Sequence, residues 1–577
     1  MEGSIGNKGR FLLGILIFLC EGALFFLILL PGSAGSGTYL STKHGDGTGN
    51  GVNRSAVTGS PYPDAASPYP RGHCDHCHEP HASVEGNEPT PPTSEGAVSY
   101  ALFRSNFGAN KNKFCYACHD TFVLNGMPLS YGYYGIYQGS TKYNASIHYS
   151  NSYMIWPSAK LLYGNVTWPP YSDAGNCINC HNPHGYSDSQ GVIPRMLIAR
   201  DSATGDSPAY EMTCEGCHDG SVTGAKNIKA QLDKTQSRHP THLYNNRHTL
   251  PETGESEGGH SFGNPPAYDK RHAECVDCHN PHTVVSGTVH TAGTTGNAVS
   301  DVLKYVWGVE PTWPSIWTQP TGFTVRRPST YPDGSQYEYQ ICFKCHSYYG
   351  LGTVTNGVST ITGPSGSPIT DQAWEFNKNN KSVHPVVVSL NNQTGSYAPK
   401  ALTSAQMSAP WTNVGTQTMY CSDCHGADDE GTGGAKGPHG SNVKYMLKGT
   451  GKYWPTKSDG VTLWRLNTTD AQDTNLFCKN CHPIYSGGWK NNVHSKWNHT
   501  NANPTCVTCH AAVPHGSKRS RLIAYYSDVS PYNYGGNNAQ LLGFKKAAGP
   551  TSYSSSNCQT QSCGSYTHNS PVSGADP

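Results

Sequence analysis

The chain has 577 residues, enough for three or four domains of ordinary size, but its composition argues against ordinary domains. Leu, Ile, Val and Phe together number 91, about 16% of the chain, below the roughly 20% that a folded core usually needs. Disorder would also require a high net charge and few aromatics, whereas 40 Lys and Arg balance 39 Asp and Glu, beside 35 Tyr and 11 Trp. A large aliphatic core and a self-repelling coil are both excluded, so the 21 Cys and 28 His are the candidates for organising the chain.

The N-terminus has the three parts of a secretory signal peptide. Lys8 and Arg10 precede an apolar run over residues 11–30, and small residues follow up to Ala34. A retained membrane anchor is the alternative, but Glu21 in the middle of the run would be costly in lipid. We therefore expect residues 1–34 to be removed, leaving a mature chain without a transmembrane segment. It would be secreted to the extracellular space or cell surface, with the periplasm as the alternative, and thiols normally oxidise there.

One cysteine motif, C-x-x-C-H, occurs nine times. It uses 18 of the 21 cysteines: Cys74, Cys77, Cys115, Cys118, Cys177, Cys180, Cys214, Cys217, Cys275, Cys278, Cys342, Cys345, Cys421, Cys424, Cys478, Cys481, Cys506 and Cys509. The histidines that complete the motifs are His78, His119, His181, His218, His279, His346, His425, His482 and His510.

This spacing is the attachment signal of haem c. Two cysteines three apart form thioethers with the vinyl groups of one haem, and the histidine that follows becomes an axial ligand of the iron. Zinc could use paired C-x-x-C units, but zinc does not require a histidine after every second cysteine. A redox dithiol would need one motif. The sequence therefore predicts nine covalently bound haem c groups.

Ten further histidines recur in two contexts and are the candidate second ligands. Five follow a first motif as Pro-His, and four precede a motif after a short polar stretch, with His44 in the same position ahead of the first motif. The Pro-His set is His81, His184, His282, His439 and His515, and the leading set is His44, His148, His239, His384 and His494. Iron with two histidine ligands is closed and passes electrons, whereas an open position indicates small-molecule chemistry. The counts favour bis-histidine iron throughout.

The order of these residues reveals a repeat of leading His, motif, Pro-His and second motif. We place paired-haem units at residues 35–145, 146–236, 237–381 and 382–491, and a single-haem unit at 492–577. Where unit 5 should have its second motif, it has Cys558 and Cys563 without a following histidine. We expect a disulfide there, on the remains of a tenth site, with an unusual haem ligated by His568 as the alternative.

Ten candidate second ligands for nine irons leave one histidine spare. It is either idle or a ligand to a neighbouring molecule, and His44, His81 and His515 are the candidates because they lie in the terminal units. The other histidines are expected at the surface or on haem propionates, although His272 and His499 lie near motifs and could replace an assigned ligand. This group comprises His73, His76, His242, His248, His260, His272, His290 and His499.

The intervals between motifs lack sustained helical periodicity and are punctuated by Asn-Pro, Gly-Pro and Asp-Gly. We expect a mostly irregular chain, with short helices at the haem motifs, a few short strands, and a hairpin or packing patch over residues 302–327. Tyr-rich stretches such as residues 524–534 should be surface aromatics or subunit contacts. The mature chain has about 60 residues per haem, so the haems should form one closely packed array with the chain wrapped around it.

Paired C-x-x-C-H units with Pro-His after the first motif resemble the doubled-motif multihaem cytochromes c of respiring bacteria and archaea. The polar, Tyr-rich character of this chain is similar to that of extracellular cytochromes that polymerise into conducting filaments, or nanowires. The resemblance covers motif order along the mature chain, not the loops. It implies bis-histidine iron, haems alternating between stacked and perpendicular pairs, and an N-terminal histidine, His81 or alternatively His44, that ligates a haem of the next subunit. Nine haems and the long inserts in units 3 and 4 depart from that pattern.

These features favour extracellular electron transfer by a homopolymer, carrying respiratory electrons to redox partner proteins or to acceptors such as metal oxides. A monomeric periplasmic or surface cytochrome is the alternative. A multihaem reductase for nitrite, hydroxylamine or sulfur oxyanions would need an open iron position, often in a C-x-x-C-K motif, and the sequence has none. We therefore do not expect an enzyme. The net charge of +1, made more negative by haem propionates, gives no support for nucleic-acid binding.

Overall fold

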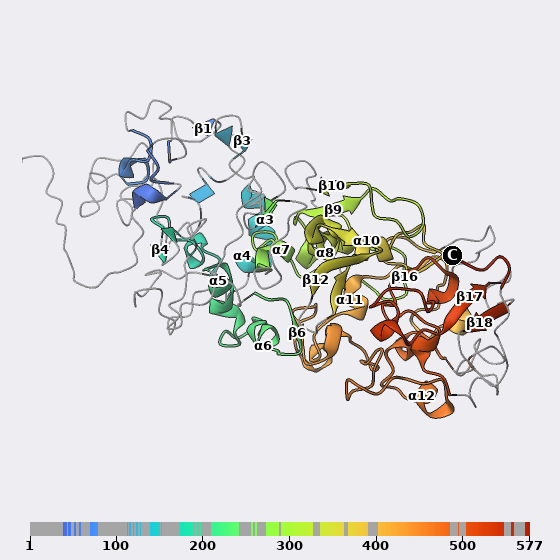
Figure 1. The fold of residues 1–577 in the computed structure, drawn as a ribbon. Coiled ribbons are helices and arrows are strands. Elements are labelled where there is room, and N and C mark those ends of the chain that lie inside the picture. The colour runs from blue at the N-terminus through green and yellow to red at the C-terminus, as the bar shows by residue number, and fades with distance from the viewer. Residues whose placement is uncertain are drawn as a thin grey trace, which may run out of the picture.

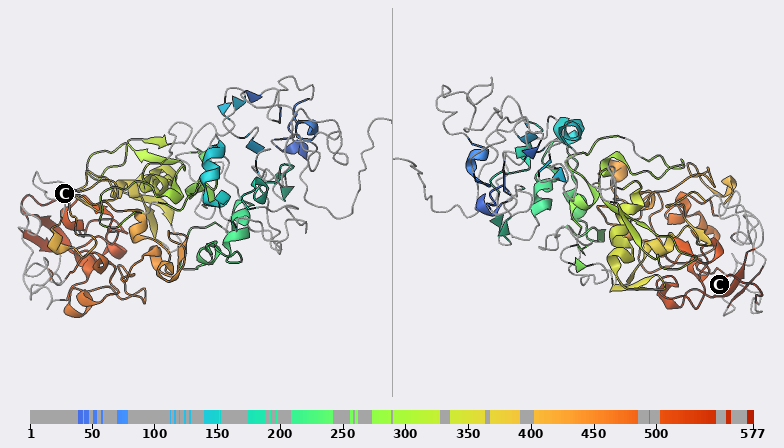
Figure 2. Two further views of the ribbon diagram at one scale, coloured as in Figure 1. Left: turned by 180° about the vertical axis from the view of Figure 1, so that it is seen from behind. Right: turned by 90° about the horizontal axis from the view of Figure 1, so that it is seen from above.

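The computed structural model describes the chain as a series of separate stretches. The longer described stretches are residues 70–78, 139–150, 174–185, 209–241, 273–287, 290–326, 335–362, 367–390, 402–484, 503–546 and 572–577. Short described pieces lie between them and from residue 39 onward. The described chain advances along the long direction of the molecule, from the blue N-terminal part at one end to the red C-terminal part at the other (Figures 1 and 2).

The described helices are short, and most contain only one or two turns. The longest are α5 (Ala209–His218) and α8 (Glu338–His346). The other α-helices are α3 (Gly139–Ala145), α4 (Ile147–Ser150), α6 (Lys229–Leu232), α7 (Cys275–Cys278), α9 (Tyr348–Leu351), α10 (Gln372–Glu375), α11 (Cys421–Cys424) and α12 (Thr468–Gln472). The 3-10 helices are η1 (Tyr39–Ser41), η3 (Cys74–His76), η6 (Cys177–Asn179), η9 (Asp301–Leu303), η10 (Ser404–Gln406), η11 (Glu430–Thr432), η12 (Lys444–Met446), η13 (Phe477–Asn480), η16 (Cys506–Thr508), η17 (Ser520–Leu522) and η18 (Tyr534–Gly536).

The strands form small antiparallel sheets of two or three strands. Neighbours in sequence pair in β1 (Val57–Thr58), β2 (Val123–Leu124) and β3 (Met127–Pro128), in β4 (Ser187–Asp188) with β5 (Gly191–Val192), and in β7 (Ser256–Glu257) with β8 (His260–Ser261). The same holds for β9 (Gly308–Pro311) with β10 (Phe323–Arg326), for β11 (Val354–Thr355), β12 (Val358–Thr362) and β13 (Pro368–Thr370), and for β17 (Leu541–Lys545) with β18 (Ser555–Cys558). Two pairs join distant segments: β6 (Ser237–Arg238) with β15 (Gly440–Ser441), and β14 (Ser382–Val383) with β16 (Gly516–Ser517).

Several small clusters rich in aromatic residues take the place of one aliphatic core. In one of them, Trp307, Val309 and Phe343 pack where α8 meets the hairpin of β9 and β10. In another, Trp464 is buried among Trp454, Leu476 and neighbouring residues. Among the described residues, buried polar side chains are about as numerous as buried apolar ones. The low aliphatic content of the sequence is thus reflected in a dispersed interior.

The expected fold class is confirmed in its coarse form: a mostly irregular chain with short helices and short strands. The hairpin expected within residues 302–327 is β9 paired with β10. The expectation for the Tyr-rich stretch 524–534 was wrong in part. Tyr525 and Tyr532 are buried, and their hydroxyls hydrogen-bond to acceptors inside the molecule, which offsets the cost of burying them. None of the described helices has the length and apolar character needed to cross a bilayer.

Candidate metal centres

The C-x-x-C-H motifs fold locally into single helical turns. The first motifs form η3, η6, α7, α11 and η16, while α5 and α8 end at the motif histidines His218 and His346. In six motifs the histidine N–H donates to the carbonyl of the first cysteine, at 2.9–3.0 Å. Residues three and four apart lie on the same face of such a turn. Both cysteines and the histidine of one motif therefore share a face, and the described motif cysteines form no disulfides.

Each motif histidine faces one histidine from another segment. The nine pairs have ring centroids 5.8–6.4 Å apart and are His44–His119, His78–His184, His148–His218, His181–His282, His239–His346, His279–His439, His384–His482, His425–His515 and His494–His510. All nine motif histidines are used once. Every partner is one of the ten candidate second ligands expected from the sequence.

The separation within these pairs is the one that a metal ion between two imidazoles requires. Each ring centre lies about 1 Å from its ligating nitrogen, and each nitrogen lies about 2.0–2.1 Å from the metal. Two ring centres on opposite sides of one metal should therefore be about 6 Å apart. Rings in direct contact lie closer, as His290 and Tyr420 do at 3.9 Å. The paired rings are therefore too far apart for direct contact, and their separation fits a metal bound by both histidines.

The partners follow a regular pattern across the repeat. A leading histidine faces the second motif of its own unit, as His148 faces His218. A Pro-His histidine faces the first motif of the preceding unit, as His282 faces His181. Unit 5 differs, because its leading His494 faces its single motif histidine, His510. Each of units 1 to 4 thus needs a histidine from the next unit to complete its first pair.

The two kinds of second histidine are held together by short strand pairs. β6 pairs with β15, so that the His239 N–H donates to the His439 carbonyl at 3.1 Å. β14 pairs with β16 in the same way, and the His384 N–H donates to the His515 carbonyl at 2.9 Å. Both second ligands of one unit are therefore fixed by a single junction with the next unit.

The Nδ1 atoms of these histidines are mostly bound to backbone carbonyls. Leading histidines use the proline of the next Pro-His: His44 with Pro183 at 3.2 Å, His148 with Pro281 at 2.7 Å, His384 with Pro514 at 2.6 Å, and His239 with Pro438. Among motif histidines, the acceptors are the carbonyls of Lys226 for His218, Val302 for His279, Tyr445 for His425 and Arg521 for His510. An Nδ1–H that donates to a carbonyl fixes the tautomer and leaves Nε2 free to bind a metal.

Burial keeps these rings neutral. Desolvation is the largest cause, and neighbouring histidines add to it, lowering the pKa of His425 and His482 to about 4. The same causes lower the pKa of His439 to about 3. A histidine must be neutral to bind a metal, so the site presents its rings in the required state at neutral pH.

The cysteines of consecutive motifs meet at the junctions between units. Cys115 contacts Cys177, Cys214 contacts Cys275, and Cys342 contacts Cys421 through their thiols. In each case the second motif of one unit meets the first motif of the next. Groups attached to these cysteines would therefore be neighbours.

Each of these junctions is bridged by a side chain that lies ahead of the second motif. The Asn112 side-chain oxygen accepts from the Cys177 N–H at 2.7 Å, and the Glu211 carboxylate from the Cys275 N–H at 3.3 Å. Glu338 accepts from the Ser422 N–H at 2.8 Å. These bonds tie the turn of one motif to that of the next.

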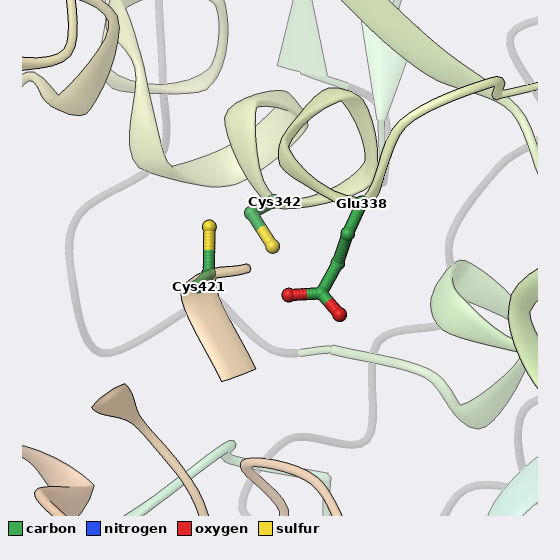
Figure 3. Close-up of side chains that lie close together, drawn as sticks. All are labelled: Glu338, Cys342 and Cys421. Carbon is green, nitrogen blue, oxygen red and sulfur yellow. The ribbon is translucent and has the colours of Figure 1, made fainter. Parts of the chain in front are cut away.

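Figure 3 shows Glu338, Cys342 and Cys421, whose ligand atoms all lie within 4.8 Å of one another. Among the described residues this is the only such group of three metal-binding side chains. The equivalent thiol contacts at Cys115–Cys177 and Cys214–Cys275 show that it is one instance of a repeated junction. Four thiols, as a zinc site of paired C-x-x-C units would need, do not converge in the described part of the chain.

Some expectations fall outside the described residues: the signal peptide at 1–34, His81, Cys118, Cys563 and His568. Of the eight histidines expected at the surface or on haem propionates, His242, His248, His272 and His499 also lie outside the described residues, and two others are not at the surface. His76 is buried with Nε2 2.9 Å from the Pro70 carbonyl, and His290 stacks on Tyr420 and lies 3.0 Å from Asp423.

The side chains that act as acceptors for two Pro-His histidines were not predicted from the sequence. Gln231 accepts from His439 and Glu375 from His515. Both acceptors come from segments that no motif marks. The only sequence signal for these junctions is the repeated His-Gly-Ser at 439–441 and 515–517.

A scan of protein-family models and searches of curated proteins and of solved structures found no match to this chain. The chemistry of the site is therefore inferred from its own residues.

Proposed function

We propose that this chain is an electron-transfer cytochrome that holds nine haem c groups, each with two histidine ligands. The observation that carries the proposal is the set of nine histidine pairs with ring centres 5.8–6.4 Å apart, each joining a C-x-x-C-H histidine to a second histidine. Haem c, when bound, supplies an iron that accepts and releases one electron.

Each pair offers two imidazoles at the separation that one metal requires, so histidines would fill both ligand positions left open by a haem held there. A substrate such as nitrite or hydroxylamine would need one of these positions. The arrangement therefore supports electron transfer and gives no support for a reductase.

The junctions between units support a continuous path. Thiol contacts at Cys115–Cys177, Cys214–Cys275 and Cys342–Cys421 bring the motifs of successive units together. Because the units follow one another along the long direction of the molecule (Figure 1), we infer a haem array that runs from one end of the chain to the other.

The pairing register favours self-association. A Pro-His histidine in units 2 to 5 faces the first motif of the preceding unit. If His81 of unit 1 follows the same pattern, it would ligate the iron of a motif that precedes Cys74. We propose that this motif belongs to a second copy of the chain. The resulting homopolymer would act outside the cell, with redox proteins or solid acceptors such as metal oxides as partners; a monomeric surface or periplasmic cytochrome is the second candidate.

Two measurements on the secreted holoprotein test these proposals. Electron paramagnetic resonance should show low-spin ferric haem alone, and cyanide should leave the visible spectrum unchanged. A high-spin signal that binds cyanide or nitrite would contradict the closed centres. Negative-stain microscopy then separates the two forms, since filaments support the homopolymer and isolated particles support the monomer.

A further inference from the structure

Two Pro-His histidines have side-chain acceptors that differ only in charge. His515 lies with Nδ1 2.6 Å from the Glu375 carboxylate, and His439 with Nδ1 3.0 Å from the Gln231 side-chain oxygen. Both acceptors are fully buried. They occupy equivalent places, because β14–β16 and β6–β15 are equivalent strand pairs.

Hydrogen bonds fix the direction of both contacts. The Gln231 NH₂ group donates to the Asp429 carboxylate at 2.7 Å and to the Ala435 carbonyl at 2.9 Å, so its oxygen accepts from His439. A carboxylate can only accept, so Glu375 accepts from His515. Nδ1–H therefore donates in both cases, and Nε2 keeps the lone pair that can bind a metal.

Glu375 is held rigidly in this position. It ends α10, and its own carbonyl accepts from the Asn380 side chain at 2.8 Å. Its second carboxylate oxygen accepts from the Tyr532 hydroxyl at 2.9 Å. Phe376 stacks on the His515 ring with centroids 4.7 Å apart. The ring and the carboxylate thus meet in one orientation, enclosed by packed side chains.

We propose that Glu375 is a positioning residue that lowers the reduction potential of the centre between His425 and His515. The inference rests on the proposed function, because it needs a haem iron between these rings. A carboxylate acceptor strengthens the hydrogen bond and makes the imidazole a stronger donor to iron. The oxidised iron, which carries one more positive charge, is stabilised over the reduced iron, and the buried negative charge adds to this preference. The centre between His279 and His439, with its neutral acceptor, has the higher potential.

The test is a potentiometric titration of the holoprotein, followed by visible absorbance. Glu375→Gln gives His515 the same acceptor as His439 and should move one of nine components to a more positive potential. Gln231→Glu should move one component to a more negative potential. Tyr532→Phe removes the competing donor from Glu375, strengthens the bond to His515 and should also move one component negative. Electron paramagnetic resonance should show a changed g-value for one low-spin component in each variant.

The haem count of each protein, by mass spectrometry, separates this inference from the proposed function. Fewer than seven haems in the unaltered chain would refute the cytochrome itself. With the haems retained, unchanged potentials in Glu375→Gln, or a negative shift, would overturn the role of Glu375. If Glu375→Gln does not load haem, Tyr532→Phe decides: a negative shift supports the proposal and an unchanged titration overturns it.

Discussion

The substitution His282→Ala tests whether His282 pairs with His181 of the preceding unit, as in the structure, or with His279 of its own unit. His282 follows its nearest motif histidine, His279, by three residues. In the structure, however, it faces His181 of the preceding unit at 5.9 Å, while His279 faces His439 at 6.1 Å. Removing the His282 ring should therefore open the centre of the motif that begins at Cys177 and leave its nearest motif closed.

The expected magnitude follows from the count of motifs. One centre of nine, about 11% of the haem, should become high-spin and bind cyanide. The ring also has an edge contact with Tyr143, at 6.1 Å between centroids. The variant should therefore lose roughly 1–3 kcal/mol of stability, the usual range for a partly buried polar side chain.

Electron paramagnetic resonance measures the high-spin fraction. Combining His282→Ala with the loss of one chosen haem then shows which motif carries the high-spin centre. In Cys177→Ala/Cys180→Ala protein, which lacks that haem, adding His282→Ala should create no high-spin signal. In the matched control, Cys275→Ala/Cys278→Ala, the signal should appear undiminished. The opposite result, with the signal lost only in the control, would refute the pairing across units.

Three further predictions concern the protein around the centres. Phe343→Ala should lower the free energy of unfolding by about 3–5 kcal/mol, because Phe343 is fully buried against Trp313 and Tyr339. Denaturation in urea measures this loss, and a loss below about 1 kcal/mol would contradict the packing. Burial raises the pKa of Asp371 to about 7, so the folded state holds its proton more tightly than the unfolded chain, whose pKa is about 3.9. The free energy of unfolding should therefore fall by up to a few kcal/mol as pH rises from about 4 to about 7, and then level off. Asp371→Asn should flatten this dependence on pH. If the variant keeps the same dependence, another group causes it. Asn112→Ala removes bonds of 2.7 Å each to the Gly175 carbonyl and the Cys177 N–H. It should lower the melting temperature through a loss of about 2–4 kcal/mol, and an unchanged melting temperature would show that these bonds do not stabilise the junction.

The coarse fold could be predicted because its causes are local. The lack of helical periodicity and the many Gly and Pro punctuations limit helices to short turns, and C-x-x-C-H itself forms one turn. The hairpin of β9 and β10 was also visible from its aromatic pattern. The burial of Tyr525 was not, because its hydroxyl is satisfied by the Asp576 carbonyl, 51 residues along the chain.

The candidate ligands could be named from the sequence, but their partners could not. Repetition singled out both the leading and the Pro-His sets. Nothing in the spacing shows that His282 reaches His181, because the contact depends on how consecutive units dock. The docking strands β6 and β15 have two residues each, too few for any pattern. Gln231 and Glu375 lie outside every motif, so only the folded chain brings them to His439 and His515.

The most direct test of the central claim is the mass of the secreted protein. The nine motifs and nine histidine pairs predict nine covalently attached haems, one on each C-x-x-C-H peptide after proteolysis. A chain carrying fewer than seven would contradict the proposal that these cysteines and histidines form haem c centres.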